Sequence, residues 1–240
     1  MSLFNHPQYL PDELNASSEE EIFYAFKEGT KELYGKDLPF ESIAILLAHS
    51  ALETGRWRVG LHRWNFGNIR AYPAKLKEDE YFTMFKCGEI LSQVAEEVFF
   101  EPPHPNSVFR AFTSREEGIK HHLKFLMKKR YKKAWEMLLV GNAAGYSHEL
   151  RAGGYYTANE KLYTRTLVKL TSEYLKKKDK LTSWRPLSIN EVQDVKTGLI
   201  SIPSIDINRP DKIDYPHTKA TGSVVLIFVA AVIAYLASLF

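Results

Sequence analysis

Apolar residues recur at three- and four-residue intervals through most of the first 180 positions, which is the spacing of amphipathic helices. The segments with this pattern are residues 22–35, 39–55, 114–131, 132–142, 143–154 and 158–180. Their predicted starts are the capping boxes Ser18 with Glu21 and Ser114 with Glu117 and the proline Pro39, and their predicted stops are Gly35 and Gly55. The pattern predicts a mainly helical domain over residues 1–180.

Residues 64–112 interrupt the helical pattern. Within them, residues 81–91 and 98–112 are rich in aromatic and β-branched side chains, which favours strands. We expect a hairpin or a small sheet lobe inserted between the helices. The predicted fold class is therefore α+β, mainly α.

The segment from residue 222 to residue 240 has a different pattern, because it is apolar and carries no charge. As a helix it would span roughly 28 Å, close to the thickness of a hydrocarbon core. The alternative is a buried helix of the globular domain, although such helices usually keep one polar face. We interpret residues 222–240 as a transmembrane anchor.

Residues 181–221 show no sustained helical period. They contain four prolines, Pro186, Pro203, Pro210 and Pro216. Such a segment does not bury enough apolar surface to fold alone, and prolines keep it extended. We interpret it as a linker, with a strand over residues 198–207 as the alternative for its middle part.

Composition adds limits to this picture. The chain has 240 residues, a net charge of +3 and a single cysteine, Cys87, so an intrachain disulfide and a cysteine-based metal site are both excluded. The charge is too weak a bias to predict nucleic-acid binding. The basic clusters at 128–133 and 176–180 are typical of solvated helix faces, or of contacts with lipid phosphates and anionic cell-wall polymers. No cofactor is implied.

Glu53 is the most informative single residue. It lies in the last turn of an almost wholly apolar helix, where the helix dipole and the loss of solvation both favour the protonated carboxyl. A protonated carboxyl is what a general acid needs to protonate a leaving glycosidic oxygen. The alternative is an exposed Glu53 that pairs with Arg56 or Arg58.

Four segments then carry a resemblance to a known family: ALETGRW (51–57), WNFGNIRA (64–71), FRAFTSREEGIKHHLKFL (109–126) and GGYYTANEKLYTRTLVKL (153–170). In order and spacing they resemble the glucosaminidase group of lysozyme-like peptidoglycan hydrolases, which contains the flagellar and autolysin glucosaminidases. The resemblance covers roughly residues 40–175. It implies a lysozyme-like α+β fold and cleavage of the glycan strand of peptidoglycan.

The resemblance also implies roles for individual residues. Glu53 takes the position of the catalytic acid, and Tyr155 takes that of a tyrosine that orients the substrate N-acetyl group or a water; the alternative for Tyr155 is packing at a helix start. Tyr156 stands where the family often has alanine. The implied substrate-binding residues are Trp64, Asn65, Phe66, Asn68 and Tyr156. For Asn65 the alternative is a turn residue that holds its own loop.

A second carboxylate is expected on the sheet lobe, where related hydrolases place one. The candidates are Glu78, Asp79, Glu80, Glu89, Glu96, Glu97 and Glu101. We favour Glu89, because it follows a glycine in a strand-like apolar context, whereas Glu78 begins a solvated charge run. It would activate water or stabilise an oxocarbenium-like state.

The sequence gives less support for a metal site or a peptidase site. His49 and Glu53 share a helix face and His121 precedes His122, but no metal-binding motif such as H-E-x-x-H is present. We interpret these residues as ordinary surface or core histidines, so no metal site is predicted. No peptidase signature surrounds Cys87.

The leading hypothesis is thus a glycoside hydrolase that cleaves between N-acetylglucosamine and N-acetylmuramic acid. The alternatives are a lytic transglycosylase and a noncatalytic peptidoglycan-binding module. The N-terminus does not resemble a secretory signal, and Arg209, Lys212 and Lys219 precede the anchor, so the positive-inside rule places the domain on the cytoplasmic side. That placement favours a phage enzyme held in a virion membrane or at the bacterial inner membrane until lysis, with an ordinary autolysin as the alternative.

Overall fold

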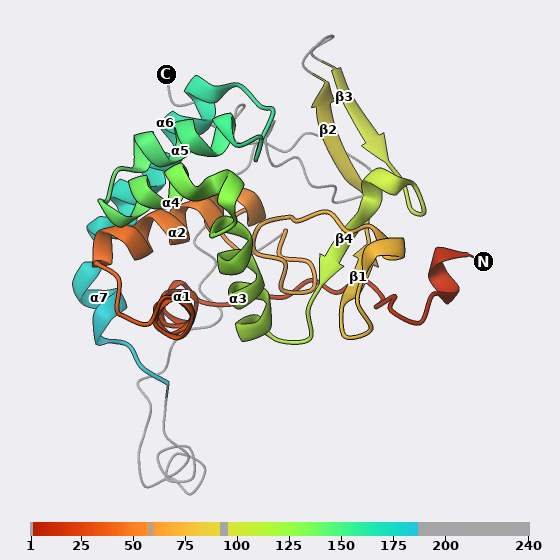
Figure 1. The fold of residues 1–240 in the computed structure, drawn as a ribbon, viewed down its shortest axis with the longest axis horizontal. Coiled ribbons are helices and arrows are strands. Elements are labelled where there is room, and N and C mark those ends of the chain that lie inside the picture. The colour runs from red at the N-terminus through yellow and green to blue at the C-terminus, as the bar shows by residue number, and fades with distance from the viewer. Residues whose placement is uncertain (1, 58–59, 92–95, 187–240) are drawn as a thin grey trace, which may run out of the picture. The chain divides into compact units, whose positions relative to one another are not determined.

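The computed structural model describes residues 2–57, 60–91 and 96–186 of the chain (Figure 1). Most of the predicted linker and the whole predicted anchor at 222–240 lie outside these residues, as does the alternative strand at 198–207. Within the described ranges, no helix combines the length and the apolar composition that crossing a bilayer requires.

The described residues form a mainly helical α+β fold, as expected. Its helices are α1 (Glu19–Tyr34), α2 (Phe40–Thr54), α3 (Arg115–Leu126), α4 (Lys132–Leu139), α5 (Ala143–Ala152), α6 (Glu160–Leu175) and α7 (Lys178–Ser183). Its strands are β1 (Tyr81–Met84), β2 (Cys87–Leu91), β3 (Glu96–Phe100) and β4 (Val108–Ala111). Short 3-10 turns occur at Leu3–Asn5, Pro73–Lys75, Pro105–Ser107 and Lys129–Tyr131.

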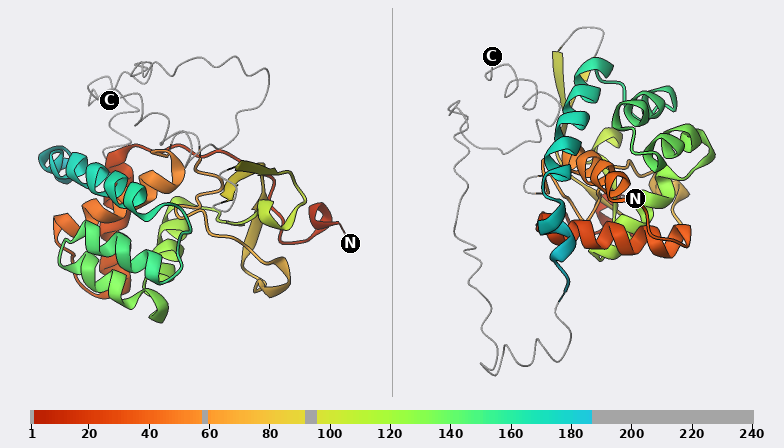
Figure 2. Two further views of the ribbon diagram at one scale, coloured as in Figure 1. Left: turned by 90° about the horizontal axis from the view of Figure 1, so that it is seen from above. Right: turned by 90° about the vertical axis from the view of Figure 1, so that its left-hand side faces the viewer.

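Helix α2 is the centre of the helical part. It packs against α1, α4 and α6. In Figure 1 the helices are grouped around it on the left, and the strands lie on the right; Figure 2 shows the same grouping from two further directions. Ile45, Leu46 and Leu47 are all fully buried. A helix that is covered on several sides has no need of a polar face, which explains its nearly continuous apolar sequence.

The helix ends largely follow the predicted signals. Ser18 and Glu21 form a complete capping box, and Gly35 and Gly55 end α1 and α2 in the left-handed conformation. The second predicted box is only half formed, because the Glu117 carboxylate accepts from the backbone of residue 113 instead of from its own cap residue.

Two predicted helices are shorter than expected. The segment 114–131 leaves the α-helical form after Leu126, and the segment 158–180 is divided into α6 and α7. Helix α7 runs to Ser183, and its Leu181 is fully buried in the main core. The linker predicted from residue 181 therefore begins within a helix of the domain.

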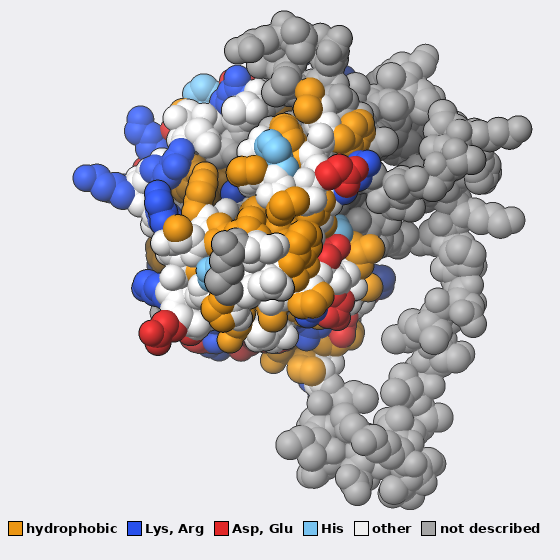
Figure 3. All heavy atoms as spheres, turned by 90° about the vertical axis from the view of Figure 1, so that its right-hand side faces the viewer, with side chains coloured by type: hydrophobic (Ala, Val, Ile, Leu, Met, Phe, Trp, Pro, Cys, Tyr) orange, Lys and Arg blue, Asp and Glu red, His pale blue; other side chains and the backbone are white. Residues whose placement is uncertain are grey.

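The predicted sheet lobe is present as two small antiparallel sheets. β1 pairs with β4, with Tyr81 opposite Ala111, and β2 pairs with β3 as an inner hairpin. The lobe has its own apolar cluster around Phe82 and Val108. Hydrophobic side chains also gather on the face seen in Figure 3, which is the right-hand side of Figure 1, where β1 and β4 lie.

Candidate active site

Helix α2 carries Glu53 at its end. The side chain of Glu53 is 18% exposed, whereas His49, one turn earlier, is fully buried. The helix stops immediately afterwards, because Gly55 adopts a φ of 57° and its N–H bonds to Ala51. The carboxyl therefore stands at the boundary between the apolar helix core and solvent.

The turn after Glu53 has an unusual backbone. Arg56 and Trp57 follow Gly55 in the left-handed region, with φ values of 57° and 59°. For side chains of this size the conformation costs on the order of 1–3 kcal/mol and persists only where the surroundings impose it. Trp57 is held by burial and by a 2.8 Å bond from its indole N–H to Ser50 Oγ.

The predicted alternative for Glu53, an ion pair with Arg56, is not observed. The Arg56 guanidinium bonds instead to Glu173 of α6. Arg58 lies outside the described residues.

The carboxyl of Glu53 instead contacts two side chains at Oε1. The Tyr163 hydroxyl on α6 donates a 2.8 Å hydrogen bond to this oxygen, and Nε2 of His49 lies 3.7 Å from it. Tyr163 falls inside a segment that resembles the glucosaminidase group, but it was not predicted as a site residue. Its sequence signal is one more aromatic residue on the core-facing side of a helix start, and nothing local links it to a residue 110 positions away.

Three tyrosines lie near this carboxyl, two of them buried and Tyr155 partly buried. Burial raises the pKa of Tyr146, Tyr155 and Tyr163 well above its ordinary value, and the negative charge of Glu53 raises each pKa further. All three hydroxyls therefore stay protonated across the physiological range and are available as donors.

Tyr155 lies beside this group without bonding to Glu53. Its ring packs edge-on against His49 at 4.7 Å, and its hydroxyl donates a 3.1 Å bond to the carbonyl of Gly67. A Cβ at position 67 would come within 2.3 Å of His122 Nδ1 and 3.0 Å of the Tyr155 hydroxyl. Only glycine permits this close approach. The hydrogen bond from Tyr155 to Gly67 ties the 64–68 loop to the helical core.

Asn65 holds its own loop, which is the alternative role considered from the sequence. It is 1% exposed; its amide donates 3.0 Å bonds to the carbonyls of Ile69 and Arg110, and its oxygen accepts from the Ile69 N–H. Phe66 is fully buried in the main core. In this conformation neither side chain is on the surface, because both are used to build the loop.

The other predicted contact residues are partly exposed. Asn68 has a φ of 46°, and its amide donates to the backbone carbonyl of Glu53, which joins the loop to the end of α2. Trp64 packs against the core and stacks on Phe66. Tyr156 lies flat against Tyr163, with ring centroids 3.8 Å apart, and bonds to Ser147. Tyr156 thus supports the tyrosine that contacts Glu53.

The favoured second carboxylate, Glu89, lies in β2 opposite Val98 of β3. The side chain of Glu89 lies outside the described part of the structure. Two competing carboxylates have structural partners: Glu101 pairs with Lys86, and Glu80 forms a 2.7 Å ion pair with Arg110. The hydrogen bond from Arg110 lowers the pKa of Glu80 to about 2, which suits an ion pair better than a catalytic base.

Of the histidines considered from the sequence, His49 and His122 are buried and His121 is partly buried. His122 is 1% exposed, and burial lowers its pKa well below the ordinary value. Burial also lowers the pKa of His121 to about 4, with the charge of Arg110 contributing. In the described part of the chain, no group of three or more His, Cys, Asp or Glu side chains is arranged to hold a metal ion. Cys87 is buried and bonds to the carbonyl of Asn106.

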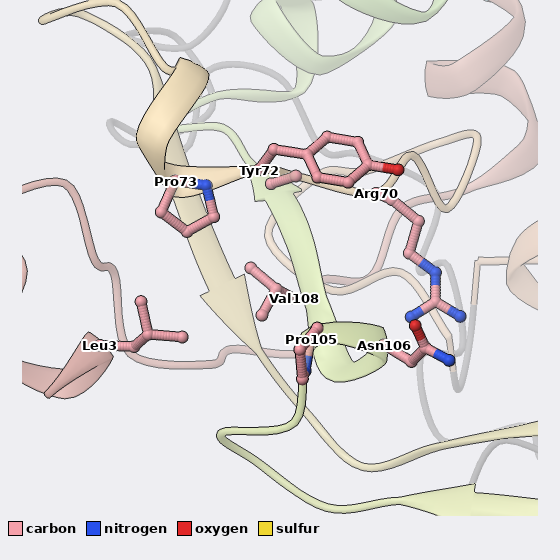
Figure 4. Close-up of a pocket in the computed structure, with 8 residues that line it drawn as sticks. Leu3, Arg70, Tyr72, Pro73, Pro105, Asn106 and Val108 are labelled. Atoms are coloured by element: carbon pink, nitrogen blue, oxygen red, sulfur yellow. The ribbon is translucent and has the colours of Figure 1, made fainter.

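A separate pocket of about 420 Å³ lies on the sheet lobe (Figure 4). Figure 4 shows the Tyr72 ring at its edge and the Arg70 and Asn106 side chains close together on one side. Its lining residues are Leu3, Arg70, Ala71, Tyr72, Pro73, Pro105, Asn106 and Val108. None of these residues is among the groups described around Glu53.

Comparisons with known proteins point to one family. The model of the glucosaminidase family, described as mannosyl-glycoprotein endo-beta-N-acetylglucosaminidase, matches residues 35–176. The matched region contains Glu53, the 64–68 loop and Tyr163. No curated protein sequence matches the chain.

Three solved structures are similar at low sequence identity. A peptidoglycan hydrolase mutant from Sphingomonas sp. A1 is 20% identical, with 65% of this chain and 98% of that chain covered and a TM-score of 0.45. The peptidoglycan hydrolase from the same organism is 18% identical, with 70% and 99% covered and a TM-score of 0.45. The glycoside hydrolase domain of Salmonella typhimurium FlgJ is 17% identical, with 77% and 100% covered and a TM-score of 0.40.

Proposed function

The chain belongs to the glucosaminidase family, and from this premise we propose that it cleaves the β-1,4 glycosidic bonds of peptidoglycan between N-acetylglucosamine and N-acetylmuramic acid. Family membership makes the protein a glycoside hydrolase. The choice of peptidoglycan is supported by the four ordered segments that resemble flagellar and autolysin glucosaminidases.

The observation that carries the proposal is the position of Glu53. Its carboxyl is 18% exposed at the end of an apolar helix, and both of its described side-chain contacts, Tyr163 and His49, are on Oε1. Oε2 is then the oxygen that faces substrate. As general acid, Glu53 gives its proton from Oε2 to the leaving glycosidic oxygen as the glycosidic bond breaks, and it becomes a carboxylate.

Tyr163 serves the same step. Its hydroxyl remains a donor, so the 2.8 Å bond to Oε1 persists and strengthens as negative charge develops on Glu53. Tyr156 fixes the ring of Tyr163 by stacking on it.

Glu89 is the proposed second carboxylate, supported by its place in β2 of the sheet lobe. In this role it takes a proton from water, whose oxygen attacks the anomeric carbon. If the substrate's own acetamido group attacks instead, Glu89 stabilises that group.

The proposed substrate contacts divide into two kinds. Trp64 and Tyr156 are partly exposed side chains that offer aromatic faces to sugar rings. Asn65, Phe66 and Asn68 act through the loop that they build, which Tyr155 fastens to the core.

We also propose that residues 222–240 anchor the enzyme in a membrane, with the catalytic domain on the cytoplasmic side or inside a virion. The uncharged sequence of this segment and the basic residues Arg209, Lys212 and Lys219 support the proposal. A phage enzyme held in this way would meet the cell wall only at entry or at lysis. Protease added outside intact spheroplasts that express the full chain tests the placement, since digestion of the domain would contradict it.

Mass spectrometry of peptidoglycan digested with the full-length protein tests the activity. Hydrolysis leaves reducing ends on the released fragments. Anhydro sugars would instead identify a lytic transglycosylase, and an absence of fragments despite binding would identify a noncatalytic module. Either of these results would overturn the hydrolase proposal.

A further inference from the structure

A buried histidine stands directly behind the proposed acid. His49 lies one turn before Glu53 on α2, is fully buried, and is enclosed by His122 of α3, Tyr146 of α5 and Tyr155. Its Nδ1 is 2.7 Å from the Tyr146 hydroxyl. Its Nε2 has no hydrogen-bond partner among the described residues and lies 3.7 Å from Oε1 of Glu53.

The Tyr146 contact fixes the tautomer of His49. Burial holds the pKa of Tyr146 well above its ordinary value, so the hydroxyl keeps its proton. A buried hydroxyl proton needs an acceptor, and the acceptor described for Tyr146 is Nδ1 of His49. A neutral imidazole that accepts at Nδ1 carries its own proton on Nε2, on the side of Glu53.

We propose that His49 is a positioning residue for Glu53, whose Nε2–H joins the Tyr163 hydroxyl at Oε1 and so confines the proton of the acid to Oε2. Two donors aimed at one oxygen leave it no room for a proton of its own. The oxygen that faces substrate is then the one that delivers the proton. The 3.7 Å separation shortens in the substrate complex, as catalytic hydrogen bonds commonly do.

The surroundings of His49 contribute no competing charge. The groups that face it are His122 from α3, Tyr146 from α5, Tyr155 from the segment before α6, and Glu53 on its own helix, while Tyr163 of α6 reaches the same carboxyl. Burial keeps His122 neutral by lowering its pKa, and the tyrosines stay protonated. Glu53 is therefore the only carboxyl among the groups of this set.

The kinetic consequences of this proposal rest on the proposed function. The position of the proton on His49 does not, and it can be tested without any activity. A donor at Oε1 stabilises the carboxylate form of the acid, and its loss lets the proton persist to higher pH. Removal of the donor should therefore move the alkaline limb of the kcat/KM profile upward, a change that a merely structural role would not produce.

Three variants of the full-length protein test this consequence. His49→Leu removes the donor and should raise the alkaline limb by about one pH unit while lowering kcat about tenfold at neutral pH. His49→Gln keeps an N–H donor at the position of Nε2 and should keep the wild-type limb. Tyr146→Phe removes the hydroxyl that selects the tautomer of His49. It should shift the alkaline limb in the same direction as His49→Leu but by a smaller amount. Should His49→Leu fail to fold, Tyr146→Phe carries the test. An unchanged alkaline limb in His49→Leu, or in Tyr146→Phe where it stands alone, overturns the proposal.

Nitrogen-15 NMR of the full-length wild-type protein in detergent gives a second test that requires no activity. We expect the chemical shifts of His49 to show a proton on Nε2 and none on Nδ1 at neutral pH. A proton on Nδ1, or an imidazolium, would overturn the proposal. If the wild-type protein leaves peptidoglycan intact, the proposed function fails, while the NMR result still decides the tautomer of His49.

Discussion

Tyr163 of α6 donates a 2.8 Å hydrogen bond to Oε1 of Glu53, which lies 110 positions earlier in the chain at the end of α2. This contact joins two of the most closely packed helices in the molecule. It links the last turn of one helix to the first turn of the other, so the packing of α2 on α6 sets the orientation of the proposed acid.

Tyr163→Phe should lower kcat about tenfold to a hundredfold, because a hydrogen bond to a charged group contributes about 1.5–3 kcal/mol. The phenyl ring keeps the stacking on Tyr156, so the fold should persist. Steady-state kinetics on purified cell walls, with thermal unfolding in parallel, measures both effects. Tyr174→Phe on the same helix is the matched control, since it removes a buried hydroxyl that is not in contact with Glu53. Equal rates for the two variants would remove Tyr163 from the mechanism.

Glu89→Gln should lower turnover by about two orders of magnitude if this carboxylate activates water. The matched control is Glu101→Gln, also in the sheet lobe, whose carboxylate pairs with Lys86 and should be dispensable for turnover. Single-turnover kinetics with both variants measures the chemical step directly. An unaffected Glu89→Gln rate would transfer the role to another group or to the substrate acetamido group.

The sequence predicted much of this structure because several signals are local. Ser18 with Glu21 marks the start of α1, and Gly55 marks the end of α2, so the position of Glu53 at a helix end is readable from nearby residues. The β lobe is likewise visible as an aromatic interruption, although its division into two nested sheets depends on which strands pair.

The side-chain partners were not predictable in the same way. Tyr163 and Tyr146 reach Glu53 and His49 across 110 and 97 positions, so no spacing rule connects them. Asn65 was expected at the sugar, yet its amide is used to close its own loop. An asparagine in a turn has the same sequence signature in either role, and only the carbonyls around it decide between them.

Stability should fall in acid between pH 6.5 and about 4 because of His121. Its pKa is lowered from 6.5 to about 4 in the folded protein, so in this window the unfolded chain binds more protons. The contribution of His121 to stability is complete above its pKa in the unfolded chain, 6.5, and is lost as the pH falls through its pKa in the folded protein, about 4. From the acid end of this window downward, the Glu80–Arg110 pair loses its contribution to stability as the pH falls from 4.5 to about 2.

Urea unfolding of His121→Gln across this range should show a shallower pH dependence than the wild-type protein, with the part due to His122 retained. His148→Gln is the control. The bond to Glu160 raises the pKa of His148, so its contribution is present below 6.5 and is lost only as the pH rises. A wild-type slope in His121→Gln would contradict the assignment.

The most direct test of the account is the release of fragments from purified peptidoglycan by full-length Glu53→Gln, measured by mass spectrometry beside the wild-type protein. The amide has the shape of the acid but lacks its proton, so the variant should stay folded, should still bind the glycan, and should release almost nothing. The wild-type protein should release fragments with reducing ends. A Glu53→Gln protein that retains more than about a tenth of wild-type turnover would contradict the role of Glu53 as general acid.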